Sequence, residues 1–224
     1  MGPSATRTAT RTPRPVTPTP TVMAGELLFE DDFSDPGSRW ATNDSADSTI
    51  RYVDDAYELT MNAATWIARP IAPRVTCADC TVDVAGTFVN DSEGTMGLML
   101  AERDYNDHFL FEVHSDGRYL VQRYADGQWS TVLAPVSSSA IKTTPGEVNH
   151  LKAVLQGGRL ALSINGTALR TVDAPGLVDA GRRGVLVISG AEGGITVRYD
   201  DFVVRSGAVA GVAGMGRVRW AGGG

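Results

Sequence analysis

The chain has 224 residues, of which 42% are hydrophobic and 25 are glycine, enough for one large all-β domain with many turns. It has no apolar run of about 18 residues, which excludes a membrane-spanning helix, and no charged start followed by an apolar block, the mark of a signal peptide. The net charge of −6 is uneven: residues 26–204 hold all 26 acids against 14 bases, or −12, between two short basic ends. Polyanion binding depends on Lys and Arg contacts to phosphate, so we expect neither nucleic acid nor an anionic membrane as partner.

Residues 1–25 are predicted to be a linker without a fold of its own. Residues 1–22 contain seven Thr and five Pro and almost nothing to bury. Proline fixes φ and removes hydrogen-bond donors, so such a segment forms an extended, semi-rigid spacer. We expect it to attach the following domain to an upstream domain or anchor; the alternative is a tail without a role.

Residues 26–205 are predicted to be all β. Short alternating or β-branched runs follow one another, separated by Gly, Asp, Asn and Pro at intervals of about 8–12 residues, which is typical of a sandwich or barrel. The runs are 27–33, 49–53, 57–61, 65–69, 81–89, 96–103, 108–114, 118–124, 130–134, 150–156, 159–165, 168–172, 183–189 and 195–204. Their number favours a two-sheet antiparallel jelly roll. Residues 206–224, with seven glycines, are predicted to be a disordered tail.

Two Asp-Gly pairs, Asp116-Gly117 and Asp126-Gly127, are predicted to be hairpin turns, because Gly and a neighbouring Asp accept the positive φ that these turns need. The two Asp then lie at opposite ends of one strand, about 30 Å apart, and cannot form a catalytic pair.

Four stretches resemble a known family. They are LLFEDDFSDPGSRW (27–40), GLMLAERDYNDHFLFEVHSDGRYLVQRYADGQW (97–129), NHLKAVLQGGRLALSINGTAL (149–169) and RGVLVISGAEGGITVRYDDFVV (183–204). Together they resemble the concanavalin A-like lectin/glucanase superfamily, and within it the laminin-G-like modules of bacterial surface and secreted proteins. The resemblance implies a jelly-roll sandwich and, with the spacer, an extracellular or cell-surface location. It leaves function open, because the fold hosts lectins, adhesion modules, glycosidases and spacers.

A glucanase of this superfamily would carry Glu-x-Asp-x-x-Glu on one strand. The nearest match, Glu102-Arg-Asp104-Tyr-Asn-Asp107, ends in Asp and crosses a predicted turn. We therefore predict no catalytic residues. Were the chain an enzyme, Glu102, His108, Glu112 and Glu58 would be the suspects, and the sequence does not place them together.

A structural Ca²⁺ is predicted where the first and last strands meet. The resemblance places these strands side by side, and oxygen ligands from Asp32 and Asp200, next to Asp31 and Asp201, could converge on an ion there. Alternatively, these acids cap strand ends or protect a sheet edge from aggregation.

Cys77 and Cys80 are predicted to form a local disulfide, as expected for an exported module. One Cys-x-x-Cys without a second pair is a weak zinc signal. Free thiols in a cytosolic protein are the alternative.

Five side chains could form a sugar platform, because aromatic faces stack on sugar C–H surfaces while charged groups bind hydroxyls. They are Trp66, Arg103, Tyr105, Arg123 and Trp129; Trp66 and Trp129 could instead belong to the core. Tyr119, between the two Asp-Gly turns, is a further candidate. Strand alternation places His108, Glu112 and His114 on one polar face, expected to be solvated or to face a ligand.

The sequence thus predicts a non-catalytic extracytoplasmic binding or adhesion module. Its expected partner is carbohydrate, a glycan or cell-wall polysaccharide, or else a protein surface. A sugar-acting hydrolase of the same fold and an inert structural spacer remain as alternatives.

Overall fold

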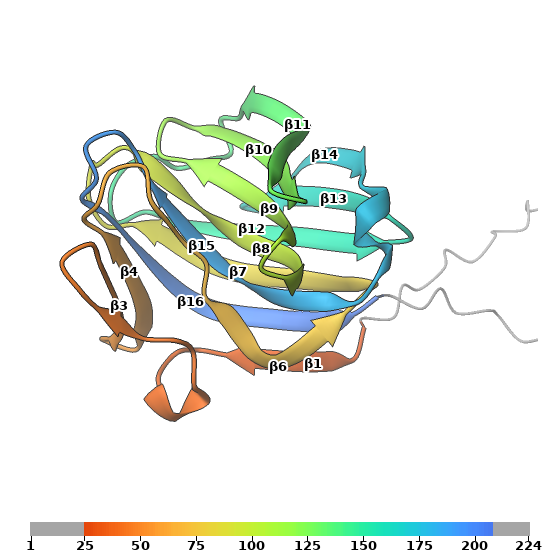
Figure 1. Ribbon diagram of the computed structural model, residues 1–224, viewed down its shortest axis with the longest axis horizontal. Helices are drawn as coiled ribbons and strands as arrows, with labels where there is room; N and C mark the ends of the chain where they lie inside the picture. Colours follow the sequence, from red (N-terminus) through yellow and green to blue (C-terminus); the bar gives the residue numbers. More distant parts are fainter. Residues whose placement is uncertain (1–24, 208–224) are drawn as a thin grey trace, which may run out of the picture. The chain divides into compact units, whose positions relative to one another are not determined.

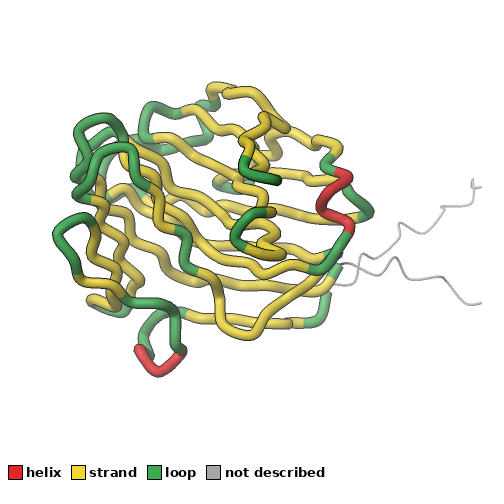
Figure 2. The backbone as a smooth tube through the Cα atoms, in the orientation of Figure 1, coloured by secondary structure: helices red, strands yellow, loops and turns green. Residues whose placement is uncertain are grey.

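A computed structural model describes residues 25–207 of the chain, and strands dominate that part (Figure 1). The predicted linker 1–25 and tail 206–224 lie almost wholly outside the described residues. The two helical segments, η1 (Pro36–Ser38) and η2 (Pro175–Val178), are single 3₁₀ turns. Figure 2 shows them among the loops that join the strands. Within residues 25–207 no helix is long and apolar enough to cross a membrane.

The strands of residues 25–207 form two antiparallel sheets that do not close into a barrel. In spatial order the nine-stranded sheet contains β14 (Thr167–Asp173), β13 (Arg159–Ile164), β12 (Val148–Gln156), β7 (Cys80–Phe88), β16 (Ile195–Ser206), β4 (Ala56–Met61), β3 (Ser48–Val53) and β2 (Asn43–Asp44), with β1 (Leu27–Asp31) also paired to β16. The seven-stranded sheet contains β11 (Gln128–Ser137), β10 (Arg118–Ala125), β9 (Asp107–His114), β8 (Gly94–Asp104), β15 (Gly181–Ser189) and β5 (Ile67–Ala68), with β6 (Ile71–Cys77) also paired to β15. The predicted jelly-roll sandwich is confirmed.

The predicted hairpins are also present. Asp126 and Gly127, both at positive φ (52° and 77°), join β10 to β11. Gly117 (φ 86°) joins β9 to β10, and the Asp116 side chain accepts the N–H of Arg118. The strand predicted at 65–69 is shorter in the structure, where it is β5. Strand β6 was not predicted, because Pro70 and Pro73 interrupt the strand pattern there.

The predicted disulfide is confirmed. Cys77 at the end of β6 is bonded to Cys80 at the start of β7. The bond therefore joins a strand of one sheet to a strand of the other.

The core fills the space between the sheets. Phe109, Phe111 and Val113 of β9 point into it, as their alternation predicts, and meet side chains such as Val82 and Val84 of β7. At one end, an aromatic cluster packs around Trp40, whose indole N–H donates to the buried carboxylate of Asp31 at 2.8 Å. The remaining face of the seven-stranded sheet, opposite the core, is called the outer face below.

One hydroxyl connects the two sheets directly. Tyr199 of β16 is fully buried, accepts the backbone N–H of Gly97 (2.8 Å) and donates to the carbonyl of Leu186. Gly97 belongs to β8 and Leu186 to β15, so one side chain of the nine-stranded sheet binds two neighbouring strands of the other. Burial raises the pKa of Tyr199 above its ordinary value of 10, which keeps the hydroxyl protonated and able to donate.

Tyr199→Phe should lower the free energy of unfolding by about 1–3 kcal/mol, because it leaves two buried backbone groups without their partner. Urea denaturation followed by tryptophan fluorescence measures this change. Tyr105→Phe is the matched control: Tyr105 is 72% exposed, so its hydroxyl should contribute less than about 0.5 kcal/mol. Equal stability of the two variants would show that the bridge does not hold the sheets together.

Candidate functional site

Five side chains form a row across the outer face of the seven-stranded sheet. Successive antiparallel pairings place them opposite one another: Trp129 (β11) faces Tyr124 (β10), Tyr124 faces His108 (β9), His108 faces Glu102 (β8), and Glu102 faces Arg182 (β15). Neighbouring strands lie about 4.8 Å apart, so this cross-strand row is about 19 Å long. One end is aromatic and the other is charged.

The aromatic end consists of three rings in mutual contact. The ring centroid of Trp129 lies 5.0 Å from that of Tyr124 and 5.6 Å from that of His108, against which it stands edge-on. Trp129 is 48% exposed, whereas His108 is 2% exposed. The alternative prediction that Trp129 is a core residue is therefore wrong. The exposed indole forms the outer wall of a polar, largely buried site.

The charged end is built around Glu102. Its carboxylate oxygens lie 3.4 Å from the guanidinium of Arg182 and 3.7 Å from that of Arg69, which lies between β5 and β6. Arg69 also contacts His108 Nδ1 at 3.1 Å and stacks on the Tyr105 ring, 4.5 Å from its centroid. Arg69 thus links Glu102, His108 and the exposed Tyr105.

Burial sets the protonation of His108. Together with the positive charge of Arg69, loss of solvent lowers the pKa of His108 from the ordinary 6.5 to about 4. The ring is therefore neutral at physiological pH. Because the Arg69 guanidinium can only donate, Nδ1 is the acceptor and the proton is on Nε2.

Burial acts on Glu102 in the opposite direction. Loss of solvent raises the pKa of this carboxyl, and the nearby charge of Asp104 adds to the rise, while Arg182 and Arg69 oppose it. Glu102 is thus a carboxyl with a raised pKa beside a neutral imidazole.

Unpartnered buried side-chain atoms concentrate in this region. Among residues 25–207 they are Glu102 Oε2, Arg103 Nε, His108 Nε2, Glu112 Oε1 and His114 Nε2. All belong to β8 or β9, but only Glu102 Oε2 and His108 Nε2 lie in the cross-strand row. Since nearly all buried polar atoms in folded proteins have a partner, these two exceptions mark a place that water or a ligand completes.

Two of the predicted platform residues lie elsewhere. Arg103 and Arg123 both bind Asp107, at 2.6 Å and 3.2 Å, and Arg103 also donates to the Gly176 carbonyl in η2. Arg123 stacks over Phe109, on the core side of the sheet. These arginines fix the β8–β9 turn to η2 and do not join the cross-strand row.

Trp66 is also separate. It is 55% exposed, so the prediction that it could be a core residue is wrong as well. Its carbonyl accepts the N–H of Ser189, seven residues along β15 from Arg182, or about 24 Å on a strand. Trp66 and the row therefore occupy opposite ends of β15.

Tyr119 is not available to a ligand in solution. It is 2% exposed and packs edge-on against Phe111 in the core. The reason is strand phase: Tyr119 pairs with Val113 on β9, and both point inward.

His108 and Glu112 do share the outer face, as predicted, but the expectation of a solvated surface is wrong. Glu112 is 4% exposed, and its carboxylate lies 3.7 Å from His114 Nε2. It is four residues from His108, about 13 Å along β9. Between them Leu110 joins Met99 and Leu186 in a second apolar cluster, with Ile67 and Ile188 packed against it.

The acidic motif crosses a turn, as predicted. β8 ends at Asp104, β9 begins at Asp107, and these two residues pair. Glu58 is on β4 of the other sheet, where it binds Arg51 and Arg198. Of the enzyme suspects, the fold brings only Glu102 and His108 into one contact group.

Asp32 and Asp200 lie near each other, but their surroundings do not define an ion site. Asp32 accepts both the N–H and the hydroxyl of Ser34. Burial, together with the charges of Asp201, Asp32 and Asp55, raises the pKa of Asp200. No group of three or more His, Cys, Asp or Glu within residues 25–207 is arranged to hold a metal. The calcium site stays a prediction.

A groove of about 910 Å³ lies in the same region, lined by β1, η1, β6 and β16 residues that include Asp31, Arg39 and Arg74. However, the carboxylate of Asp31 is already used by Trp40 and Phe33. We favour the row because it combines exposed aromatic rings with buried, unpartnered polar atoms.

Arg69, Tyr124 and Arg182 are functional candidates that the sequence did not reveal. Arg69 precedes Pro70 in an irregular stretch, and Arg182 lies beside a bulge that interrupts the pairing of β15. Of the three, only Tyr124 could have been found from the sequence, because strand alternation puts it on the face opposite Tyr119 and Val121.

His108 should remain neutral down to about pH 4. Because the pKa is lowered in the folded state, the free energy of unfolding should fall as the pH drops from 6.5 toward 4, and His108→Gln should lose part of this dependence. Titration of the three histidine ring signals by NMR tests the value, with exposed His150 as the reference signal. A His108 signal that titrates near 6.5 would contradict the buried, Arg69-bound arrangement.

The comparisons with known proteins agree on the fold. No protein-family model matches the chain, and no curated protein sequence is detectably similar. The solved structures include the carbohydrate-binding module CBM66 from Bacillus subtilis (13% identity, TM-score 0.58, 80% of this chain and 97% of that one). A protein of unknown function with a galectin-like fold, also from Bacillus subtilis, has 12% identity and a TM-score of 0.65 (84% and 99%).

A third similar structure is SCLam, a non-specific endo-β-1,3(4)-glucanase of family GH16 (10% identity, TM-score 0.56, 82% of this chain and 93% of that one). A binding module and a glucanase thus have the same architecture at very low sequence identity. The chain has the concanavalin A-like sandwich fold, as its resemblance to that superfamily predicts.

Proposed function

We propose that this chain is a non-catalytic carbohydrate-binding module and that its ligand lies on the cross-strand row. The observation that carries the proposal is the contact between an exposed indole, Trp129, and the buried His108–Glu102 pair with its unpartnered atoms. Aromatic faces bind the C–H faces of sugars, and a few convergent polar groups fix their orientation. The fold-level likeness to a carbohydrate-binding module is consistent with this proposal.

The polar groups of the row suit sugar hydroxyls. The neutral His108 ring offers an Nε2–H donor. Glu102 Oε2, which pairs with Arg182 at 3.4 Å but makes no hydrogen bond, offers an acceptor on the next strand. A hydroxyl can satisfy both kinds of group, because it donates one hydrogen bond and accepts others. Arg69, stacked on the exposed ring of Tyr105, lies against His108 and Glu102. The side chains of Arg69 and Tyr105 must therefore move when a ligand binds His108 Nε2 and Glu102 Oε2.

The site is proposed to take a short ligand. Beyond the row, the outer face is occupied by the apolar cluster of Met99, Leu110 and Leu186, each fully buried. That filled surface offers no polar atoms to a sugar chain running along β9. One or two sugar units at the row fit this geometry better than a long polysaccharide segment laid across the sheet.

An extracellular or cell-surface location is part of the proposal. The disulfide is typical of proteins that fold in oxidising compartments. With the Thr/Pro-rich residues 1–25 as linker, the module would be held at a distance from an upstream domain or anchor.

Trp129→Ala should weaken sugar binding about tenfold or more, since loss of one stacking face removes about 1.4 kcal/mol or more of binding free energy. Trp66→Ala is the matched control, because Trp66 has similar exposure but lies at the other end of β15. Affinity electrophoresis on a panel of polysaccharides identifies a ligand, and calorimetry with its oligosaccharides measures the affinity. Equal losses in both variants, or no binding by the wild type at millimolar sugar, would remove the proposal.

A sugar hydrolase is the second candidate, and the raised pKa of Glu102 favours it, because a general acid needs such a shift. Hydrolysis, however, also requires a second carboxylate, about 5–9.5 Å away depending on the stereochemistry. On the outer face, Glu112 lies about 13 Å along β9 from His108, the residue opposite Glu102. The row itself contains no other acid. Asp104, whose charge acts on Glu102, is outside the row, at the end of β8 where it pairs with Asp107 beside the β8–β9 turn.

We therefore expect the wild-type protein to release no more reducing sugar than Glu102→Gln from any polysaccharide that it binds. The assay compares both proteins over long incubation at several pH values from 4 to 8, because the pKa of the buried Glu102 is raised. Release by the wild type that Glu102→Gln abolishes, with binding retained, would make the chain a hydrolase.

A further inference from the structure

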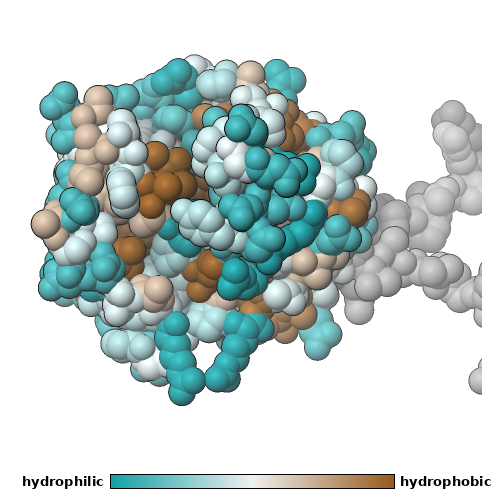
Figure 3. All heavy atoms as spheres, in the orientation of Figure 1, coloured by the Kyte–Doolittle hydropathy of each residue, from teal (hydrophilic) through white to brown (hydrophobic). Residues whose placement is uncertain are grey.

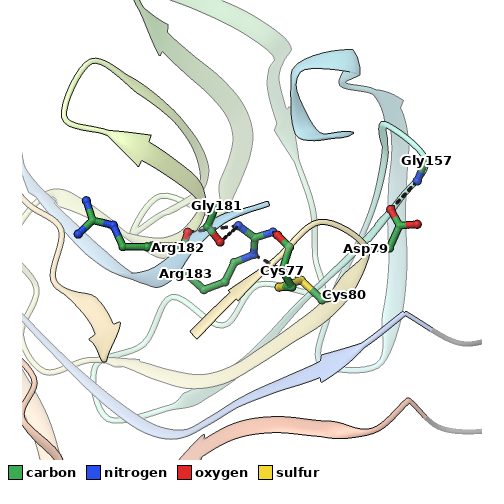
Figure 4. The surroundings of a disulfide bond; sticks show 7 residues. All are labelled: Cys77, Asp79, Cys80, Gly157, Gly181, Arg182 and Arg183. Atoms are coloured by element: carbon green, nitrogen blue, oxygen red, sulfur yellow. Dashed lines mark hydrogen bonds between the residues drawn. A yellow bond between two sulfur atoms is a disulfide. The ribbon is translucent and has the colours of Figure 1, made fainter. Parts of the chain in front are cut away.

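A second polar site lies in the core next to the charged end of the row, where Arg183, the residue after Arg182 on β15, meets the disulfide. Arg183 of β15 is fully buried, and its guanidinium is directed at Cys77 and Cys80, whereas Arg182 points away from them (Figure 4). Its Nε–H donates to Cys80 Sγ at 3.4 Å, and its other donors bind the carbonyls of Cys77, Gly181 and Arg182.

Arg183 lacks a carboxylate partner. No acid within residues 25–207 forms an ion pair with Arg183. Each of its hydrogen bonds is made to a neutral acceptor. A buried charge without an opposite charge is costly, and loss of solvent lowers the pKa of Arg183 to about 10. The position of the guanidinium beside a sulfur atom therefore needs a reason beyond hydrogen bonding to carbonyls.

A thiolate at Cys80 would supply the missing negative charge. In the disulfide the sulfur is neutral and a weak acceptor, but after reduction it can ionise, and an adjacent Arg favours the thiolate. We propose that Cys77–Cys80 is a thiol–disulfide exchange site, with Arg183 holding Cys80 as a thiolate in the reduced protein. The site is separate from the cross-strand row and does not depend on sugar binding.

The two sulfurs would have different roles. Cys77 is 8% exposed and Cys80 is fully buried, so an external thiolate reaches Cys77 more easily. The sulfur of the external thiolate would bond to Cys77 Sγ while the Cys77–Cys80 bond breaks. The electron pair of that bond would go to Cys80 Sγ beside Arg183. The second thiolate of the same dithiol then attacks the external sulfur. This releases the external molecule as a disulfide and leaves the Cys77 thiolate, which takes up a proton. The reductant is a dithiol, and a stabilised leaving thiolate speeds the first step.

The fold around the pair does not rely on the bond alone. Asp79, between the two cysteines, accepts the Gly157 N–H with its carboxylate (2.8 Å) and the Gly207 N–H with its carbonyl (2.9 Å). The disulfide also joins residues only three positions apart, so it restricts the unfolded chain little. The turn should therefore survive reduction.

Cys77→Ser leaves Cys80 as a single thiol and tests the proposal directly. The thiolate is followed by its ultraviolet absorbance against pH, with Cys77→Ser/Cys80→Ser as the blank. Arg183 is the charged group in contact with the sulfur, while Asp79, the nearest acid in the turn, is bound to Gly157. We expect Cys80 to ionise at least about one pH unit below 8.5, the usual value for Cys, and a value at or above 8.5 overturns the proposal.

Arg183→Met tests the cause. In equilibrium with dithiol buffers, the wild-type disulfide should be half reduced at a dithiol-to-disulfide ratio about tenfold lower than that needed by Arg183→Met. An unchanged ratio in a folded Arg183→Met protein overturns the proposal. If circular dichroism shows that Arg183→Met does not fold, Arg183→Lys, which keeps the charge, replaces it. In the Cys77→Ser/Arg183→Lys protein, Cys80 must still ionise below pH 8.5.

Discussion

The hydroxyl of Tyr199 is the contact on which the geometry of the candidate site depends. It binds Gly97 of β8 and Leu186 of β15, and these two residues pair directly with each other in the seven-stranded sheet. The same two strands carry Glu102 and Arg182 further along. By fixing β8 and β15 to β16 at one point, the hydroxyl fixes the register that brings the acid and the guanidinium together. Gly97 also lets β9 lie close to β8, because a side chain there would collide with the Phe111 carbonyl.

Irregular pairing places Glu102 on the outer face. The register of β8 against β9 shifts between Met99 and Ala101 and again between Glu102 and Asp104, and β15 shifts beside Arg182. Bulges of this kind re-aim side chains and are common beside functional sites. Here they occur in the two strands that form the charged end of the row, while the aromatic end lies on the paired hairpin of β10 and β11. The space-filling view in Figure 3 shows the surface on this side as separate hydrophobic patches among hydrophilic side chains.

Local patterns were sufficient for the fold but not for the site. Alternation in β9 correctly separated Phe109 and Phe111 from His108 and Glu112, and the Asp-Gly pairs correctly marked hairpins. In RYLVQRY, alternation puts Tyr124 on the face opposite Tyr119 and Val121, but both faces carry a buried aliphatic residue, Val121 or Leu120. Alternation alone therefore does not say which face is the core, and Tyr119 is buried. The row itself joins residues from 102 to 182 through non-local pairings, which a single sequence does not contain. Arg69 and Arg182 were therefore beyond reach.

The same burial that makes Glu102 resemble a catalytic acid also argues for binding. A carboxyl with a raised pKa, flanked by two guanidiniums and a neutral imidazole, presents hydrogen-bonding atoms whose geometry is fixed before a ligand arrives. Hydrolysis needs a second carboxylate opposite the first, and that place in the row is held by His108, whose low pKa keeps it a neutral donor. An inert spacer would have no reason to keep such groups buried without partners, since each one destabilises the fold. The combination of one shielded acid, one fixed donor and an exposed indole therefore supports the proposed recognition of a small uncharged ligand rich in hydroxyl groups.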